Sequence, residues 1–253
     1  MRNWLGLGDV YDATIERIKA QGGYESSLGM GALMWISKAE WPLSPDGLCH
    51  TLGIELGSVD FNSSNIPSIT TVVSCCQGLM VVGKGASCVR LVHFTLKEYF
   101  SAHPDIFGRP HSAMAEICLT YLNSQQVKDL STNSSADVCK VVHDKPFLEY
   151  RSLYWATHAK RELSDYLRSL ALQLLQVYDG HISAQILLRH GMSLRSQNPH
   201  TWSPFSGVHC ASYLGFVEIV VALIDMRACD PNGTDFRGCS HLHGLPGRDV
   251  RKW

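Results

Sequence analysis

Neither sign of charge dominates this sequence of 253 residues, which has 22 basic and 23 acidic side chains and a formal net charge of −1. Proteins that coat nucleic acid or acidic membranes usually carry a basic excess, so its absence argues against both kinds of partner. Long apolar runs are also missing. No stretch approaches the ~18 consecutive apolar residues of a membrane span, and the N-terminal "MRNWLGLGDVYD" has no run suited to a signal peptide. We therefore expect a cytoplasmic protein that binds neither nucleic acid nor membrane.

Cysteine pairs with C-x-x-C spacing are absent, although the chain has nine cysteines. An odd number without such pairs argues against a disulfide framework, so we expect reduced and mostly buried thiols. Histidines and cysteines near the C-terminus could suggest zinc, but their spacings do not match those of a zinc finger. We therefore predict no metal site in this group, which comprises His209, Cys210, Cys229, Cys239, His241 and His243, and we expect no bound cofactor in the chain.

What the sequence does contain is typical of a globular protein, with 45% apolar and 18% charged residues. Apolar residues recur mostly at helical spacing, which predicts a mainly α-helical fold. The polar stretch 124–138 is rich in serine and asparagine and is expected to be a loop or a weakly ordered insert. The expected helices cover residues 10–21, 28–38, 66–76, 93–103, 111–124, 146–163 and 165–178.

Two helix boundaries have clear signals. The pair Gly22-Gly23 predicts the end of the first helix, because glycine adopts the conformation that closes a helix. Ser44 followed by Pro45 predicts a helix start, since serine is a good N-cap and proline suits the first helical position.

The stretch Gly78–Lys84 has the spacing of a phosphate-binding loop, G-x-x-x-x-G-K. Such a loop needs a flexible interior, a Ser or Thr after the lysine, and a helix that begins there. Here the interior is Leu-Met-Val-Val, Gly85 follows the lysine, and a second β-branched run, "CVRLV", comes next. We therefore predict a two-stranded hairpin with Lys84 in its turn. A nucleotide-binding NTPase that uses Gly78–Lys84 is the alternative.

A degenerate repeat is visible near the C-terminus. The stretch "SGVHCASYLGFVEIVVALID" (206–225) resembles the ankyrin pattern T-P-L-H-x-A-A-x-x-G-x-x-E-I-V-x-L-L, and "DFRGCSHLHG" (235–244) resembles the start of a following repeat. Gly207 and His241 replace the proline of the pattern. "HISAQILLRHGMS" (181–193) resembles the second half of an earlier repeat. The residues at the structural positions of the pattern are His209, Ala211, Gly215, Gly238 and His243.

Longer stretches resemble fungal NACHT–ankyrin proteins of the STAND class of signalling NTPases, which are related to NOD-like receptors. The resemblance is carried by "ALMWISKAEWPLSPDGLCHTLGIELGS", "NIPSITTVVSCCQGLMVV", "VRLVHFTLKEYF" and "FLEYRSLYWATHAK". It implies a winged-helix module made of three helices, a hairpin and a closing helix. One label for this module derives from a GPI inositol-deacylase, but hydrolase chemistry is not implied, because the sequence has no G-x-S-x-G motif.

The resemblance also implies a role for His93. In NOD-like relatives the histidine of the motif H-x-T/S-x-x-E-Y/F-F contacts the phosphate of bound ADP, a contact to which an imidazole N–H is chemically suited. Two roles are therefore open for His93. It caps its own helix, or it senses the phosphate of a nucleotide held by a NACHT domain, which we expect to be missing before Met1.

The expected organisation has four parts: residues 1–25 as the end of a preceding helical segment, 26–108 as the winged helix, 109–180 as a helical connector and 181–253 as an incomplete ankyrin region. We expect a non-enzymatic regulatory and protein-interaction fragment, in which the winged helix gates a NACHT domain of a parent protein and the ankyrin surface binds a protein partner. A truncated gene fragment without function is a further alternative. The expected protein-binding residues are Trp202, Ser206, His209, Tyr213, Asp235 and Arg237.

Overall fold

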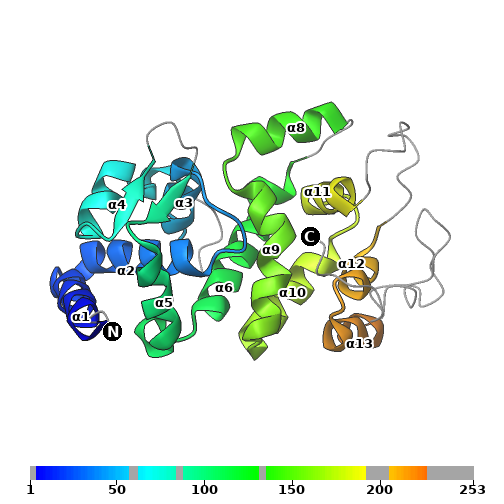
Figure 1. The fold of residues 1–253 in the computed structure, drawn as a ribbon. Coiled ribbons are helices and arrows are strands. Elements are labelled where there is room, and N and C mark those ends of the chain that lie inside the picture. The colour runs from blue at the N-terminus through cyan, green and yellow to red at the C-terminus, as the bar shows by residue number, and fades with distance from the viewer. Residues whose placement is uncertain (1–3, 57–61, 84–87, 131–134, 192–204, 227–253) are drawn as a thin grey trace. The chain divides into compact units, whose positions relative to one another are not determined.

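The computed structural model describes residues 4–56, 62–83, 88–130, 135–191 and 205–226. These residues are mainly helical, and their β-structure is one two-stranded antiparallel sheet (Figure 1). The prediction of a mainly α-helical fold with a small hairpin is therefore confirmed.

The chain divides into two compact units, Met1–Glu55 with Asn62–Met114 and Leu56–Phe61 with Ala115–Trp253. The division falls within α6 (Pro110–Leu122) and is coarser than the four expected parts, which stay predictions.

The first unit is organised around α2, which packs against α1, α3, α4 and β2. Leu33 and Trp35 of α2 are fully buried in this core. Gly29 lets α2 approach α4 closely, because a Cβ atom at this position would lie 2.6 Å from the carbonyl oxygen of Cys75. The elements are α1 (Trp4–Ala20), α2 (Gly23–Lys38), α3 (Pro45–Leu52), α4 (Ile69–Cys75), β1 (Met80–Val82), β2 (Val89–Leu91) and α5 (Phe94–Ala102), with 3-10 turns at Ser63–Asn65 and Pro104–Phe107.

The strands β1 and β2 form the predicted hairpin. Val82 pairs with Val89 and Met80 with Leu91. The backbone N–H of Val89 also donates to the carbonyl oxygen of Leu43 at 2.8 Å, which ties the segment between α2 and α3 to β2. The glycine-rich turn around Lys84 lies outside the described residues.

The second unit is built from packed helices. α9 packs against α11, and α10 packs against both α12 and α13, which also pack against each other (Figure 1). Trp155 of α9 is fully buried and stacks on Phe216, with ring centroids 5.9 Å apart. Its elements after α6 are α7 (Gln125–Lys128), α8 (Ser135–Asp144), α9 (Leu148–Arg161), α10 (Asp165–Gln176), α11 (Ile182–Gly191), α12 (Gly207–Tyr213) and α13 (Val217–Asp225).

Three sequence predictions of local structure are corrected. α2 begins at Gly23, five residues before the predicted start at Leu28. α4 begins at Ile69 rather than Ile66, because the Ser68 hydroxyl caps it by accepting from the Thr71 N–H at 3.1 Å. The stretch 124–138 is not simply a loop, since it contains α7 and the start of α8.

Candidate functional site

His93 lies between β2 and α5 and is the N-cap of α5. Its Nδ1 atom accepts from the backbone N–H of Thr95 at 3.3 Å. The imidazole is exposed and lies against the ring of Phe94, with centroids 4.5 Å apart. Val92 and Phe94 are themselves 47% and 66% exposed. The described structure therefore places His93 in an apolar surface patch and gives it the capping role that the sequence left open.

A polar bridge joins His93 to α1. The Thr95 hydroxyl lies 2.8 Å from His93 Nδ1 and 2.7 Å from the Tyr11 hydroxyl. One helical turn further along α5, the Tyr99 hydroxyl donates to the carboxylate of Asp12. Burial, together with this hydrogen bond, raises the pKa of Tyr99. Two hydrogen bonds, at Thr95 and Tyr99, thus fix α5 to neighbouring residues of α1.

The interior of the phosphate-loop lookalike is a strand. Met80–Val82 forms β1 and pairs with β2, and Gly78 precedes it with a φ of +83°. The next helix among the described residues, α5, begins at Phe94, after β2. A phosphate-binding loop instead curls its backbone N–H groups around the ligand, immediately before a helix. Residues 78–83 therefore do not form the curled backbone that a phosphate loop requires, since they run into a strand.

The ankyrin-like stretch forms the helix pair α12 and α13. Ser206 and His209 make a capping box: the Ser206 N–H donates to His209 Nδ1 at 3.2 Å, and the Ser206 hydroxyl accepts from the His209 backbone. Ala211 is fully buried, and Gly215 has a φ of +69° at the turn between the helices. These residues have structural roles within the helix pair, and their assignment to an ankyrin repeat stays a prediction.

The expected protein-binding residues differ in accessibility. Tyr213 is 37% exposed, whereas His209 is 8% exposed and Ser206 is half-buried. Of these three, only Tyr213 offers a substantial surface to a partner. Lys160 contributes to the same region, because its ammonium group donates to the carbonyl oxygen of Leu214. The remaining predicted site residues, Trp202, Asp235, Arg237, Gly238 and His243, lie outside the described residues.

The described cysteines are all free thiols, and five of the seven are buried. Burial raises the pKa of Cys210 and of Cys118 to about 12 in each case. A thiolate, the form that binds metals, is therefore disfavoured at both positions. Among the described residues no three His, Cys, Asp or Glu side chains are grouped so that they could hold a metal ion.

Sequence reasoning missed a buried arginine. Arg151 of α9 is fully buried, and its guanidinium carbon lies 3.8 Å from the ring centroid of Tyr121 and 5.0 Å from that of Phe147. Burial lowers the pKa of Arg151 to about 10, so it keeps its charge at neutral pH. Phe147 has a φ of +77°, an uncommon value for a bulky residue. The ring of Tyr121, in α6, and the ring of Phe147, at the start of α9, thus both lie against the buried cation of Arg151.

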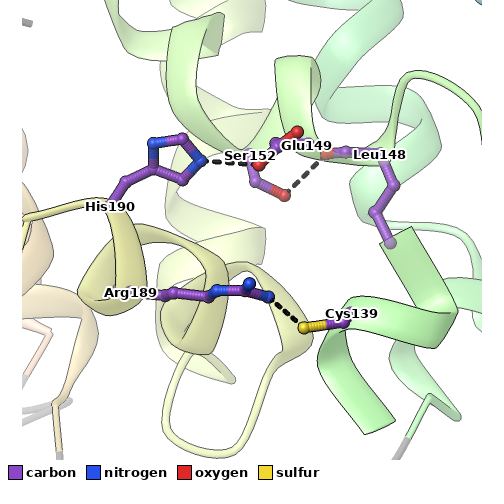
Figure 2. A network of polar contacts seen from close by, with 6 residues as sticks. All are labelled: Cys139, Leu148, Glu149, Ser152, Arg189 and His190. Carbon is purple, nitrogen blue, oxygen red and sulfur yellow. Dashed lines mark hydrogen bonds and ion pairs between the residues drawn. The ribbon is translucent and has the colours of Figure 1, made fainter. Parts of the chain in front are cut away.

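A second polar cluster connects α8, α9 and α11 (Figure 2). Arg189 donates to the Cys139 sulfur at 2.7 Å, and His190 Nε2 lies 2.6 Å from a Glu149 carboxylate oxygen. Exposed pairs of this kind contribute little to stability individually. We interpret the cluster as a link between helices.

Comparison with protein-family models, with curated proteins and with solved structures found no match to this chain. The resemblance to NACHT–ankyrin proteins therefore stays a prediction from the sequence. No helix in the described part of the chain is both long enough and apolar enough to cross a membrane.

Proposed function

We propose that this chain is a non-enzymatic regulatory and protein-interaction part of a STAND-type signalling NTPase. In this proposal the first unit is a winged helix that gates a NACHT domain, and the second is a helical connector followed by an ankyrin-type helix pair. No step of catalysis is assigned to the chain.

The arrangement of the first unit supports the winged-helix interpretation. Helices α2, α3 and α4 precede the hairpin, and Leu43, between α2 and α3, is hydrogen-bonded to β2. In such an arrangement the hairpin is the wing. DNA binding is not part of the proposal, because α4, the candidate recognition helix, contains no Lys or Arg to contact phosphates.

The observation that carries the gating role is the position of His93. Its Nδ1 atom is occupied by the cap of α5, while the exposed ring has its Nε2 atom available to another molecule. Within the described residues no hydrogen bond is made by Nε2. A phosphate group near this atom would also benefit from the positive end of the α5 dipole. The proposed role of His93 is to contact the phosphate of an ADP held by a NACHT domain.

The second unit supports the protein-binding role. α13 is apolar around most of its circumference, and Val217 and Val221 are each 51% exposed. Tyr213 adds an exposed aromatic ring at the end of the neighbouring α12. Exposed apolar side chains on packed helices of a repeat type are suited to contact with further protein.

Nucleotide binding by the purified chain distinguishes the proposal from an NTPase. We expect neither saturable ATP binding in the presence of Mg²⁺ nor phosphate release, because β1 occupies the place of a phosphate loop. Lys84→Ala should change neither result. Calorimetric titration and a phosphate-release assay measure the two quantities. Saturable ATP binding that Lys84→Ala abolishes would overturn the proposal.

A further inference from the structure

We propose that Thr95 and Tyr11 are positioning residues that hold His93 in its Nε2–H tautomer, so that the imidazole presents an N–H donor at its exposed edge. The relevance of this tautomer to a phosphate rests on the proposed function. The tautomer itself follows from hydrogen bonds within this chain, and it can be measured without any ligand.

The direction of each hydrogen bond is fixed by its chemistry. The backbone N–H of Thr95 can only donate, so His93 Nδ1, 3.3 Å away, must accept and carries no proton. The Thr95 hydroxyl, 2.8 Å from the same Nδ1, then donates to it as well. Because that hydroxyl has used its only proton, it accepts from the Tyr11 hydroxyl at 2.7 Å. The proton of the neutral imidazole is left on Nε2.

The relay of hydrogen bonds that runs from Tyr11 through Thr95 to His93 is buried and is held in place by further contacts. Tyr11 and Thr95 are only 7% and 6% exposed, so water does not readily replace either hydroxyl. The ring of Tyr11 packs edge-on against Tyr99, with centroids 5.3 Å apart, and Tyr99 is bound to Asp12 of the same helix as Tyr11. A displacement of α1 from α5 would therefore remove the Tyr11 donor and weaken the control of the tautomer.

Another histidine, His103 at the end of α5, provides an internal standard that is expected to have the opposite tautomer. His103 Nδ1 lies 2.9 Å from the carbonyl oxygen of Tyr99, which can only accept. His103 is therefore held in the Nδ1–H tautomer. A method that distinguishes the two ring nitrogens should give opposite results for His93 and His103 in the same sample.

The test is long-range proton–nitrogen NMR of the ¹⁵N-labelled full chain at about pH 8.5, which is about two pH units above the reference pKa of histidine in model peptides. We expect Nε2–H for His93 and Nδ1–H for His103. Thr95→Val keeps the shape of the side chain but removes the hydroxyl. It should lower the ratio of the Nε2–H to the Nδ1–H tautomer of His93 about fivefold to tenfold, as the loss of one hydrogen bond implies. Thr95→Ser should restore it, and Tyr11→Phe should lower it less.

An unchanged His103 signal verifies that α5 is intact in each variant. An Nδ1–H signal from His93 in the unaltered protein, or a ratio that does not move in folded Thr95→Val, overturns the proposal. If Thr95→Val does not fold, Tyr11→Phe provides the test in its place, and an unchanged ratio there overturns the proposal. A ratio that moves in Thr95→Val but not in Tyr11→Phe overturns the role of Tyr11.

The outcome is separate from that of the proposed function. If His93 has the expected tautomer but a NACHT domain loaded with ADP does not bind the chain through His93, the proposed function fails and the positioning role stands. If such binding occurs while the tautomer is mixed, the positioning role fails alone.

Discussion

Gly207→Ala is expected to lower the free energy of unfolding of the second unit by about 3 kcal/mol or more. Gly207 is the first residue of α12, and a Cβ atom there would overlap the carbonyl oxygen of Leu175 and lie 2.6 Å from its carbonyl carbon. These are backbone atoms at the end of α10 and cannot rotate away. The same contact gives a physical reason for the departure from the ankyrin pattern, because proline at this position would also introduce a Cβ atom.

Gly180→Ala is the matched control in the same unit. Gly180 has a φ of +89°, but a Cβ atom there would meet nothing within 4 Å. Its substitution therefore carries a conformational cost of about 1–2 kcal/mol without a clash. Urea unfolding followed by circular dichroism measures both variants. If Gly207→Ala lowers the free energy of unfolding no more than Gly180→Ala does, α12 does not pack against α10 as closely as described.

His181 is expected to make the second unit less stable in acid. Its Nε2–H donates to the carbonyl oxygen of Leu122 at 3.1 Å, and its Nδ1 accepts from the Ser183 N–H at 3.2 Å. Burial lowers the pKa of His181 to about 4, although the hydrogen bond to Leu122 opposes this shift, and Lys128 adds a smaller lowering effect. Protonation would place a proton on the Nδ1 acceptor and a charge in an apolar site.

The sign of the effect follows from the two pKa values. The unfolded chain binds a proton near the ordinary pKa of about 6.5 and the folded chain only near 4, so stability falls as the pH decreases through this interval. The complete loss is about 3 kcal/mol. His181→Asn keeps a cap acceptor but does not titrate. The difference in unfolding free energy between the two proteins should therefore shrink by that amount between about pH 7.5 and about pH 4. A difference that is independent of pH would contradict the assignment.

Local signals in the sequence predicted several helix ends correctly. Ser44 caps α3 by accepting from the Gly47 N–H at 2.9 Å, with Pro45 at the first position, as expected from the residue types. Gly22 and Gly23 do separate two helices, but the glycine pair could not reveal that α2 starts at once, because glycine more often ends a helix than begins one. Serine-rich composition likewise concealed α8, which begins at Ser135.

Contacts between distant residues explain what the sequence could not show. The motif around His93 identified a candidate residue, but its relay includes Tyr11, which lies 84 positions before Thr95. Arg151 occurs in a helix with polar residues and has no local signal of burial. It is buried because Tyr121 of α6 packs over its guanidinium group. Periodicity describes one helix at a time and does not identify the partner that covers it.

The proposed role of His93 is to detect the phosphate of ADP in a NACHT domain. The most direct test is the affinity of the full chain for a separately produced NACHT domain of a fungal NACHT–ankyrin protein, with and without ADP. We expect tighter binding with ADP and a loss of about tenfold or more in His93→Ala, as for a hydrogen bond to a charged group. His103→Ala, at the opposite end of α5, is the matched control and should bind normally. Equal binding with and without ADP, or unchanged binding by His93→Ala, would contradict the claim.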